Sequence, residues 1–133
     1  MQRFQPDKGL VVVRAALHGP AGVARLALAV DTGATGTLIN AAPLVSIGYD
    51  PALATQRVEV TTGSSVEFAT RLVVDKLDAI EDSRNNFSVL CHTLPPSTMV
   101  DGVLGLDYFR GKVLTIDFDR GLISLTQRRK RRR

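Results

Sequence analysis

The chain has 133 residues, 44% of them apolar and only 5% aromatic, which is enough for one domain with a sizeable core but not for two lobes. Its formal net charge of +4 is misleading, because six of the 17 basic residues occupy positions 128–133 and leave 11 against 13 acidic residues in the rest. The composition therefore excludes a basic nucleic-acid-binding body, and no apolar run is long enough to span a membrane.

Short apolar or alternating segments bounded by Gly, Pro, Asn and Asp recur along the chain, and such segments are typical of β-strands. In chain order, strands are expected at residues 10–17, 23–30, 37–40, 56–60, 66–68, 71–77, 86–91, 113–118 and 122–125. Many short strands with closely spaced turns predict an all-β fold that is closed or nearly closed.

Two short helical segments are expected between the strands, at residues 41–47 and 106–110. Asn40 is the expected N-cap of the first segment and Gly48 its stop. The polar stretch 78–85 is expected to separate the strands on either side of it. Cys91 lies in an apolar strand and is expected to pack as a small hydrophobic residue rather than act as a reactive thiol.

The sequence Asp31-Thr32-Gly33-Ala34 follows the apolar run 26–30, so the Asp31 carboxylate is expected at the end of a strand where the backbone turns. Gly33 has no Cβ to block approach to the carboxylate, and backbone N–H groups at such a turn favour the charged form of Asp31. A carboxylate that only caps its own turn is the structural alternative.

A second apolar segment ending in glycine, Val103-Leu104-Gly105, accompanies this motif, and the pair resembles the retropepsin-like aspartic proteases. The Leu-Gly-Leu-Asp sequence at 104–107 is more similar to cellular, largely bacterial members than to viral ones. The resemblance covers roughly residues 9–126 and implies a small closed β-barrel of the acid-protease type with one or two short helices. Residues 1–8 are then an N-terminal extension, residues 9–126 the protease domain and residues 127–133 a basic C-terminal tail.

Hydrolysis of a peptide bond by carboxylates needs one group to activate water and another to protonate the leaving amine. Two carboxylates a few ångströms apart share one proton and do both, and aspartic proteases are the established example. Since the chain carries one Asp-Thr-Gly, the resemblance implies a homodimer in which Asp31 of both subunits meets on the two-fold axis. No metal or other cofactor is expected, because two histidines and one cysteine show no ligand spacing.

The resemblance also implies roles for single residues, with Asp31, Thr32 and Gly33 as the catalytic group. The Thr32 hydroxyl would brace the pair of carboxylates across the axis, and Gly33 would donate its N–H to the carboxylate. The residues expected to contact an extended peptide or protein substrate are Ala34, Leu38, Thr62, Gly63, Ser64, Val103 and Leu104. The hairpin tip 61–65 would be a flap that closes over the substrate with Gly63 as hinge, although an ordinary hairpin has the same pattern.

Two positions differ from the viral pattern. Thr35 stands where viral members usually have an acid, and Leu106 stands where they often have Arg, so an inter-strand ion pair is expected to be absent. Asp107 is expected either to brace the Asp31 loop or to serve the N-terminus of the helix. The last hairpin and the N-terminal strand are the expected dimer interface. The alternative function is a non-catalytic dimeric peptide-binding module of the same fold.

The basic tail at 128–133 has three readings: a solvated end, a salt-sensitive contact with nucleic acid or anionic lipid, or a boundary within a larger protein. The first is preferred, because no aromatic residues interleave with the charges. No secretory signal is seen at the start of the chain. A soluble, cytoplasmic protein is the default expectation, and membrane anchoring or export to the periplasm would need an upstream segment.

Overall fold

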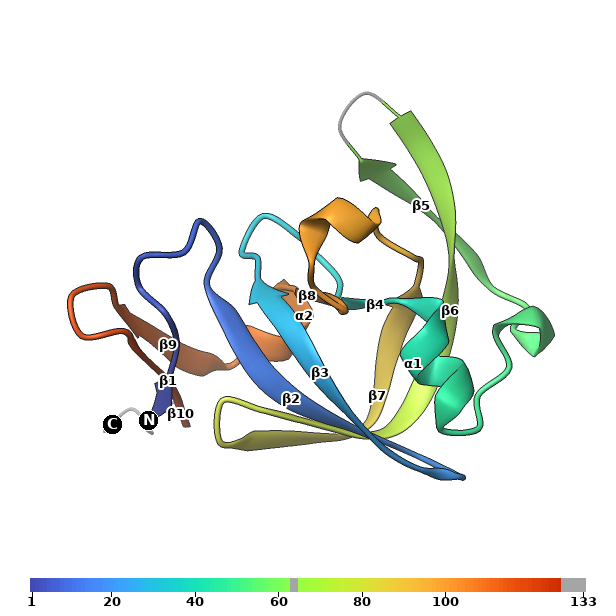
Figure 1. The fold of residues 1–133 in the computed structure, drawn as a ribbon. Coiled ribbons are helices and arrows are strands. Elements are labelled where there is room, and N and C mark those ends of the chain that lie inside the picture. Colours follow the sequence, from blue (N-terminus) through green and yellow to red (C-terminus); the bar gives the residue numbers. More distant parts are fainter. Residues whose placement is uncertain (63–64, 128–133) are drawn as a thin grey trace, which may run out of the picture.

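Six strands close a β-barrel in the computed structural model of the chain, which describes residues 1–62 and 65–127 (Figure 1). The strands are β1 (Gln2–Arg3), β2 (Val12–Gly19), β3 (Gly22–Val30), β4 (Leu38–Ile39), β5 (Arg57–Thr62), β6 (Ser65–Ala79), β7 (Asp82–Cys91), β8 (Gly102–Leu104), β9 (Lys112–Asp117) and β10 (Leu122–Gln127). The helices are α1 (Ala41–Ser46) and α2 (Leu106–Phe109), with 3-10 turns η1 (Pro51–Leu53) and η2 (Pro96–Thr98). The barrel runs β2-β3-β8-β4-β7-β6 and closes where β6 pairs with β2, which confirms the predicted all-β barrel with two short helices.

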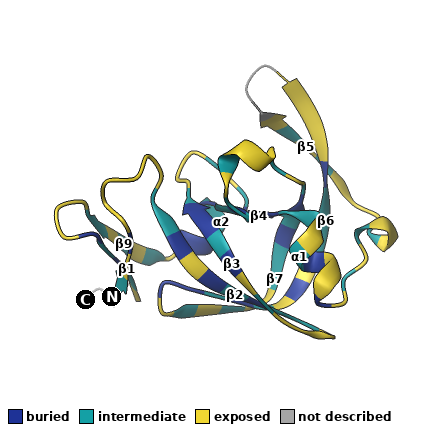
Figure 2. Cartoon of the chain, in the orientation of Figure 1, coloured by how far each residue is buried: buried dark blue, intermediate teal, exposed yellow. Residues whose placement is uncertain are grey.

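Alternation along the strands fills the barrel interior, as Figure 2 shows by the buried positions on its strands. On β2, Val13, Ala15 and Leu17 are buried, while Arg14 between them is exposed. The buried side chains join one hydrophobic core that extends to α1 and α2. Each fully buried aliphatic side chain contributes about 1.5–3 kcal/mol relative to an exposed one, so this alternation fixes the register of the barrel strands. Cys91 is part of this core, as predicted.

Strand β6 corrects two predictions. The segments 66–68 and 71–77 are one continuous strand of 15 residues. Most of the polar stretch 78–85 belongs to the strands themselves, since residues 78–79 end β6 and residues 82–85 begin β7. Only Ile80 and Glu81, with φ of 55° and 58°, form the turn between the two strands. The Tyr108 hydroxyl holds this turn, because it accepts from the Ala79 N–H at 3.0 Å and lies 2.9 Å from the Ala79 carbonyl oxygen. Polarity alone could not reveal a turn secured by a side chain from a distant helix.

The N-terminal residues add a strand that the sequence did not predict. Strand β1 pairs with β10, and β10 pairs with β9, to form a second, three-stranded sheet beside the barrel. Phe4 is buried, donates its N–H to the Gly121 carbonyl at 2.9 Å and packs edge-on against Phe118. Both described ends of the chain therefore lie in one sheet, as Figure 1 shows.

Strand β8 is the point at which the two halves of the barrel interlock. It runs parallel to β3 and antiparallel to β4, and β4 in turn runs parallel to β7. Gly102 permits this crowding, since a Cβ built there would lie 2.0 Å from the Leu38 carbonyl oxygen. The result is that the loop after β3 lies beside the loop after β8.

Helix α1 begins where predicted but without the predicted cap. The Asn40 side chain makes no capping hydrogen bond; its Oδ1 accepts from the Leu94 N–H at 3.0 Å and its Nδ2 donates to the Val100 carbonyl at 3.3 Å. Asn40 thus ties β4 to the segment before β8, a contact that local sequence does not encode. Gly48, with φ of 100°, follows the helix end as predicted. Neither α1 nor any other helix in the described residues has the length and apolarity to cross a membrane.

Candidate active site

Asp31 lies directly after β3, in an exposed loop. Its N–H donates to the Leu104 carbonyl at 2.9 Å, so the backbone is fixed to β8 just where the strand ends. Its Oδ1 accepts from the Gly33 N–H at 2.9 Å. No donor within residues 1–62 and 65–127 bonds to its Oδ2. The carboxylate is therefore held through one oxygen while the other stays open to solvent or a ligand.

A buried threonine supports this loop from below. Thr37 is wholly buried, and its N–H donates to both carboxylate oxygens of Asp107, at 2.9 and 3.0 Å. Its hydroxyl donates to Asp107 Oδ1 at 2.7 Å and accepts from the Gly105 N–H at 3.1 Å. Asp107 therefore braces the Asp31 loop, which is one of the two roles expected from the sequence.

Backbone contacts join the loop to the start of α2. The Leu106 N–H donates to the Ala34 carbonyl at 2.8 Å, and the Asp107 N–H donates to that of Thr35 at 3.3 Å. At Gly105 a Cβ would lie only 2.6 Å from the backbone carbon of Gly36. The two segments recognised from sequence thus pack backbone against backbone, and that packing needs glycine at the end of β8.

The structure brings together only part of the predicted site. Asp31, Thr32 and Gly33 lie exposed and adjacent in one loop, and Ala34 and Val103 are half-buried. The prediction that Leu38 and Leu104 line a substrate pocket needs correction, because their side chains are 5% and 0% exposed. Leu104 instead belongs to the core and serves the site through its carbonyl. Strand alternation explains this, since positions 102 and 104 of β8 face inward while 103 faces out.

The β5–β6 hairpin extends away from the barrel, as Figure 1 shows, and pairs to its end at Thr62 and Ser65. The predicted substrate contacts Gly63 and Ser64 lie outside the described residues, and only the backbone of Thr62 is described. Val66 and Phe68, which were not among the predicted substrate contacts, are 60% and 61% exposed on one face of β6 near the tip. Their spacing of two in a strand beside a polar hairpin tip is the sequence signal that would have predicted an exposed apolar face there.

A second polar cluster lies away from Asp31. The His18 ring nitrogen Nε2 lies 2.8 Å from Asp78 Oδ2, and the Ser83 hydroxyl donates to Oδ1 of the same carboxylate. Partial burial favours a higher pKa for Asp78, but the hydrogen bonds of Ser83 and His18 and the charge of Lys76 outweigh it and leave the pKa below its usual value. Both partners meet the carboxylate rather than each other, so the cluster has no serine–histidine nucleophile pair among the described residues.

Two further reactive groups, the Cys91 thiol and the Tyr108 hydroxyl, are buried. Burial raises the pKa of the Cys91 thiol, which disfavours the thiolate. Burial likewise raises the pKa of the Tyr108 hydroxyl well above its usual value, in keeping with its structural role at the β6–β7 turn. Across residues 1–62 and 65–127, no three His, Cys, Asp or Glu side chains gather as a metal-binding group would.

Comparison with known proteins identifies the family. Residues 21–111 match the family model described as "gag-polyprotein putative aspartyl protease". Among solved structures, the chain is similar to a retropepsin-like aspartic protease from Rickettsia conorii, with a TM-score of 0.69 and 18% identity over 95% of this chain and 88% of that chain. At this identity the likeness shows the fold. No curated protein matches the chain. The matched residues include both the Asp31 loop and the end of β8, and the chain belongs to the retropepsin-like aspartic protease family.

Proposed function

We propose that the protein is a homodimeric aspartic endopeptidase in which the two Asp31 carboxyl groups meet across the two-fold axis. The observation that carries the proposal is the state of Asp31: an exposed carboxylate, fixed through Oδ1 to Gly33 and open at Oδ2, on a braced loop. One such group per chain leaves the second to come from a second copy.

The chemistry follows from the two carboxyl groups. Like charges a few ångströms apart cannot both ionise, so one group is protonated and the other ionised. The ionised group takes a proton from water as the water attacks the peptide carbonyl carbon, and the protonated group donates to the carbonyl oxygen. Return of a proton to the amine then releases the two products. The rate should therefore follow a bell-shaped curve with pH.

Substrate binding is supported by the exposed surfaces around Asp31. The Gly33 carbonyl would accept a hydrogen bond from an extended peptide, and the small side chain of Ala34 leaves room for the peptide backbone. Val103 is the half-exposed apolar residue of β8. Val66 and Phe68 on the β5–β6 hairpin offer apolar surface that a closing flap would place on a substrate.

The proposed dimer interface is the sheet formed by β1, β10 and β9, in which β1 and β9 are the two outer strands. The edge strand β9 and the turn after it carry the exposed apolar residues Val113 and Phe118. An outer strand with unpaired backbone groups readily pairs with another chain, and apolar side chains next to it add area to such a contact.

The second candidate is a dimeric binding module that holds a peptide without cutting it. The Gly33 N–H bond to Asp31 Oδ1 favours it, since the same contact would occur in a carboxylate that only caps its turn. Asp50 shows such a turn in this chain, where Oδ1 accepts from the Ala52 N–H at 3.0 Å.

The two candidates separate in a peptide-library digest run across pH with wild type, Asp31→Asn and Asp50→Asn. Asp50 is the matched control, because it is exposed and bonds to the N–H two residues on, as Asp31 does. Asp31→Asn should lose cleavage by at least about 10²-fold while Asp50→Asn retains it. Wild type that binds peptide but never cuts it, from acid to neutral pH, would favour the binding module.

Subunit mixing tests the shared site directly. Equal amounts of wild type and Asp31→Asn should, after exchange, leave about half of the wild-type subunits paired with a variant partner. Activity per wild-type subunit should then fall by about half, because a mixed dimer holds only one carboxylate. Unchanged activity per wild-type subunit, or a protein that cuts while sedimenting only as a monomer, would contradict the dimeric site.

A further inference from the structure

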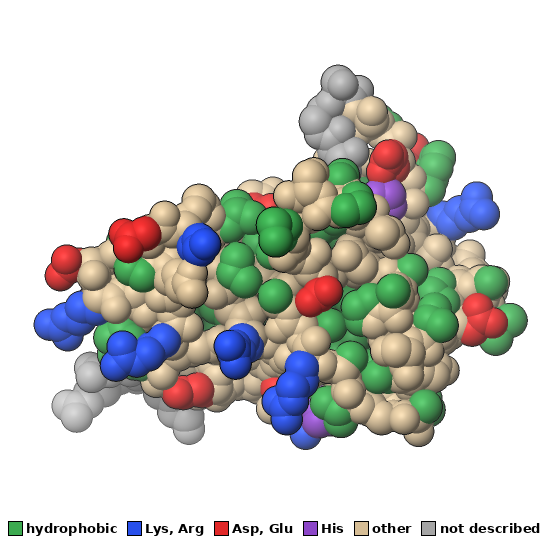
Figure 3. Space-filling model, in the orientation of Figure 1, with side chains coloured by type: hydrophobic (Ala, Val, Ile, Leu, Met, Phe, Trp, Pro, Cys, Tyr) green, Lys and Arg blue, Asp and Glu red, His purple; other side chains and the backbone are tan. Residues whose placement is uncertain are grey.

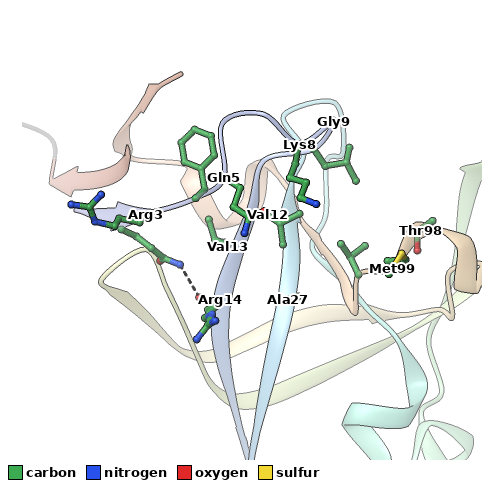
Figure 4. A pocket seen from close by; sticks show the side chains of 14 residues that line it. Arg3, Gln5, Lys8, Gly9, Val12, Val13, Arg14, Ala27, Thr98 and Met99 are labelled. Carbon is green, nitrogen blue, oxygen red and sulfur yellow. Dashed lines mark hydrogen bonds between the residues drawn. The ribbon is translucent and has the colours of Figure 1, made fainter. Parts of the chain in front are cut away.

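A hollow of about 950 Å³ lies between the N-terminal segment, the outer face of β2 and β3, and the segment that leads into β8 (Figure 4). Its apolar walls are formed by Leu10, Val12, Ala27, Met99 and Val100. Figure 4 shows the two walls facing each other across β2 and β3, with Lys8 and Val12 on one side and Thr98 and Met99 on the other. None of these residues belongs to the Asp31 site described above.

The apolar wall includes an exposed methionine in an unfavourable backbone conformation. Met99 is 87% exposed and has a φ of 57°, in the left-handed region that a non-glycine residue occupies at a cost of about 1–2 kcal/mol. Leu10 across the hollow is 50% exposed. The left-handed conformation of Met99 ends the 3-10 turn η2, where the Met99 N–H donates to the Pro96 carbonyl at 3.2 Å, and it leaves the Met99 side chain in solvent beside the hollow.

The charged residues that line the hollow are all basic, and Figure 3 shows Lys and Arg side chains on this face of the molecule. Arg3, Lys8 and Arg14 line it and are exposed, and no Asp or Glu does so. Within the described part of the chain, none of the three forms an ion pair. Asp101, next to Val100 in sequence, accepts a hydrogen bond at Oδ2 from the Ala27 N–H at 2.8 Å and forms no ion pair with any of the three. The hollow therefore suits a ligand that combines apolar surface with negative charge.

Both walls are bonded to the strand that carries Asp31. The Val30 N–H donates to the Val11 carbonyl at 2.8 Å, and the Asp101 N–H donates to the Ala27 carbonyl at 2.8 Å. Ala27 precedes Asp31 by four residues of extended chain, which corresponds to about 13 Å. An extended peptide with its scissile bond at Asp31 would cover this distance in about four residues.

We infer that this hollow is a substrate subsite that selects acidic residues flanked by apolar ones, about four positions from the scissile bond. The inference rests on the proposed function, because it takes the occupant to be a peptide that also reaches Asp31. The apolar walls contact the apolar side chains of the peptide, and Lys8 and Arg14 bind the carboxylates of the neighbouring acidic residues.

Binding of matched decapeptides to the full chain carrying Asp31→Asn tests the inference without cleavage. The peptides share a central Leu-Phe and apolar residues elsewhere, and they differ only at the fourth position on either side of the Leu–Phe bond, where they carry Glu, Ser or Lys. The Glu peptide should bind about tenfold more tightly than the Lys peptide at low salt, with a ratio that falls as salt screens the charges. Adding Lys8→Glu and Arg14→Glu together should remove or invert the ratio.

Arg25→Glu is the matched control, since Arg25 is an exposed cation on β3 that does not line the hollow. It should leave the ratio unchanged. Met99→Gly should weaken binding of the Glu and Lys peptides alike by about fivefold, through the lost apolar contact, while thermal stability stays equal or rises. If Met99 had only a structural role, Met99→Gly would leave peptide binding unchanged and lower the thermal stability.

Equal affinities for the three peptides, no binding of any of them, or an Arg25→Glu variant that loses the ratio equally would overturn the inference. A monomeric Lys8→Glu, Arg14→Glu variant in sedimentation would also overturn the inference, because the hollow would then be the surface that binds a second copy of the chain. Asp31-dependent cleavage with no charge preference would leave the proposed function intact and refute only the subsite. A charge preference without cleavage would refute the endopeptidase instead.

Discussion

Replacing Thr37 by valine tests how strongly the Asp31 loop depends on its buried brace. Valine keeps the shape but removes the hydroxyl, which donates to Asp107 at 2.7 Å and accepts from the Gly105 N–H at 3.1 Å. A hydrogen bond to a charged acceptor contributes about 1.5–3 kcal/mol, and a buried N–H left without an acceptor costs about 1–3 kcal/mol. Because the Thr37 N–H still bonds to Asp107, we expect the free energy of unfolding to fall by about 3 kcal/mol.

The measurement is urea unfolding followed by far-UV circular dichroism at one fixed protein concentration, since the chain has no Trp and a dimer would unfold in a concentration-dependent way. Thr35→Val is the matched control, because Thr35 is exposed in the same loop and contributes its carbonyl rather than its hydroxyl. It should change stability by less than about 0.5 kcal/mol. Equal stability losses in the two variants would refute the brace.

Three further predictions concern the fold. Tyr108→Phe should lower the free energy of unfolding by about 1–3 kcal/mol in the same urea assay, because the β6–β7 turn loses its buried hydroxyl partner; an unchanged midpoint would contradict this. Gly105→Ala should prevent accumulation of folded protein, since its Cβ would lie 2.6 Å from the Gly36 backbone, and a normal circular dichroism spectrum would be the contrary result. Asp78→Asn should reduce stability at neutral pH, and the difference from wild type should disappear in acid, because a carboxyl with a lowered pKa stabilises the fold above its unfolded pKa and loses that effect as pH falls through the folded pKa. A stability difference that persists undiminished in acid would count against the Asp78 hydrogen bonds as its cause.

The fold was predictable from sequence wherever local pattern and tertiary packing agree. The apolar runs that became β2 and β3, and the glycine that follows β8, identify the barrel and the crowded point beside Asp31. Predictions were wrong where a distant side chain decides the local structure. Asn40 bonds to the segment before β8 instead of capping α1, and Tyr108 secures a turn inside a stretch that is polar enough to read as a loop.

The sequence predicted which residues form the Asp31 loop, but it did not predict which of the neighbouring side chains are exposed. Asp31 and Gly33 are adjacent in the chain, so their hydrogen bond follows from the motif itself. The burial of Leu104 depends on which face of a three-residue strand points inward, and so short a segment gives no periodicity to read. The brace by Asp107 depends on a contact between segments 70 residues apart, which the sequence left as one of two roles.

The N-terminal strand β1 hydrogen-bonds to β10 of its own chain. This pair needs no strand from a second copy, so under the proposed function folding and assembly are expected to be separate steps. The amount of working enzyme would then rise with the square of subunit concentration when dimers are scarce, and dilution alone would switch the protein off without unfolding it.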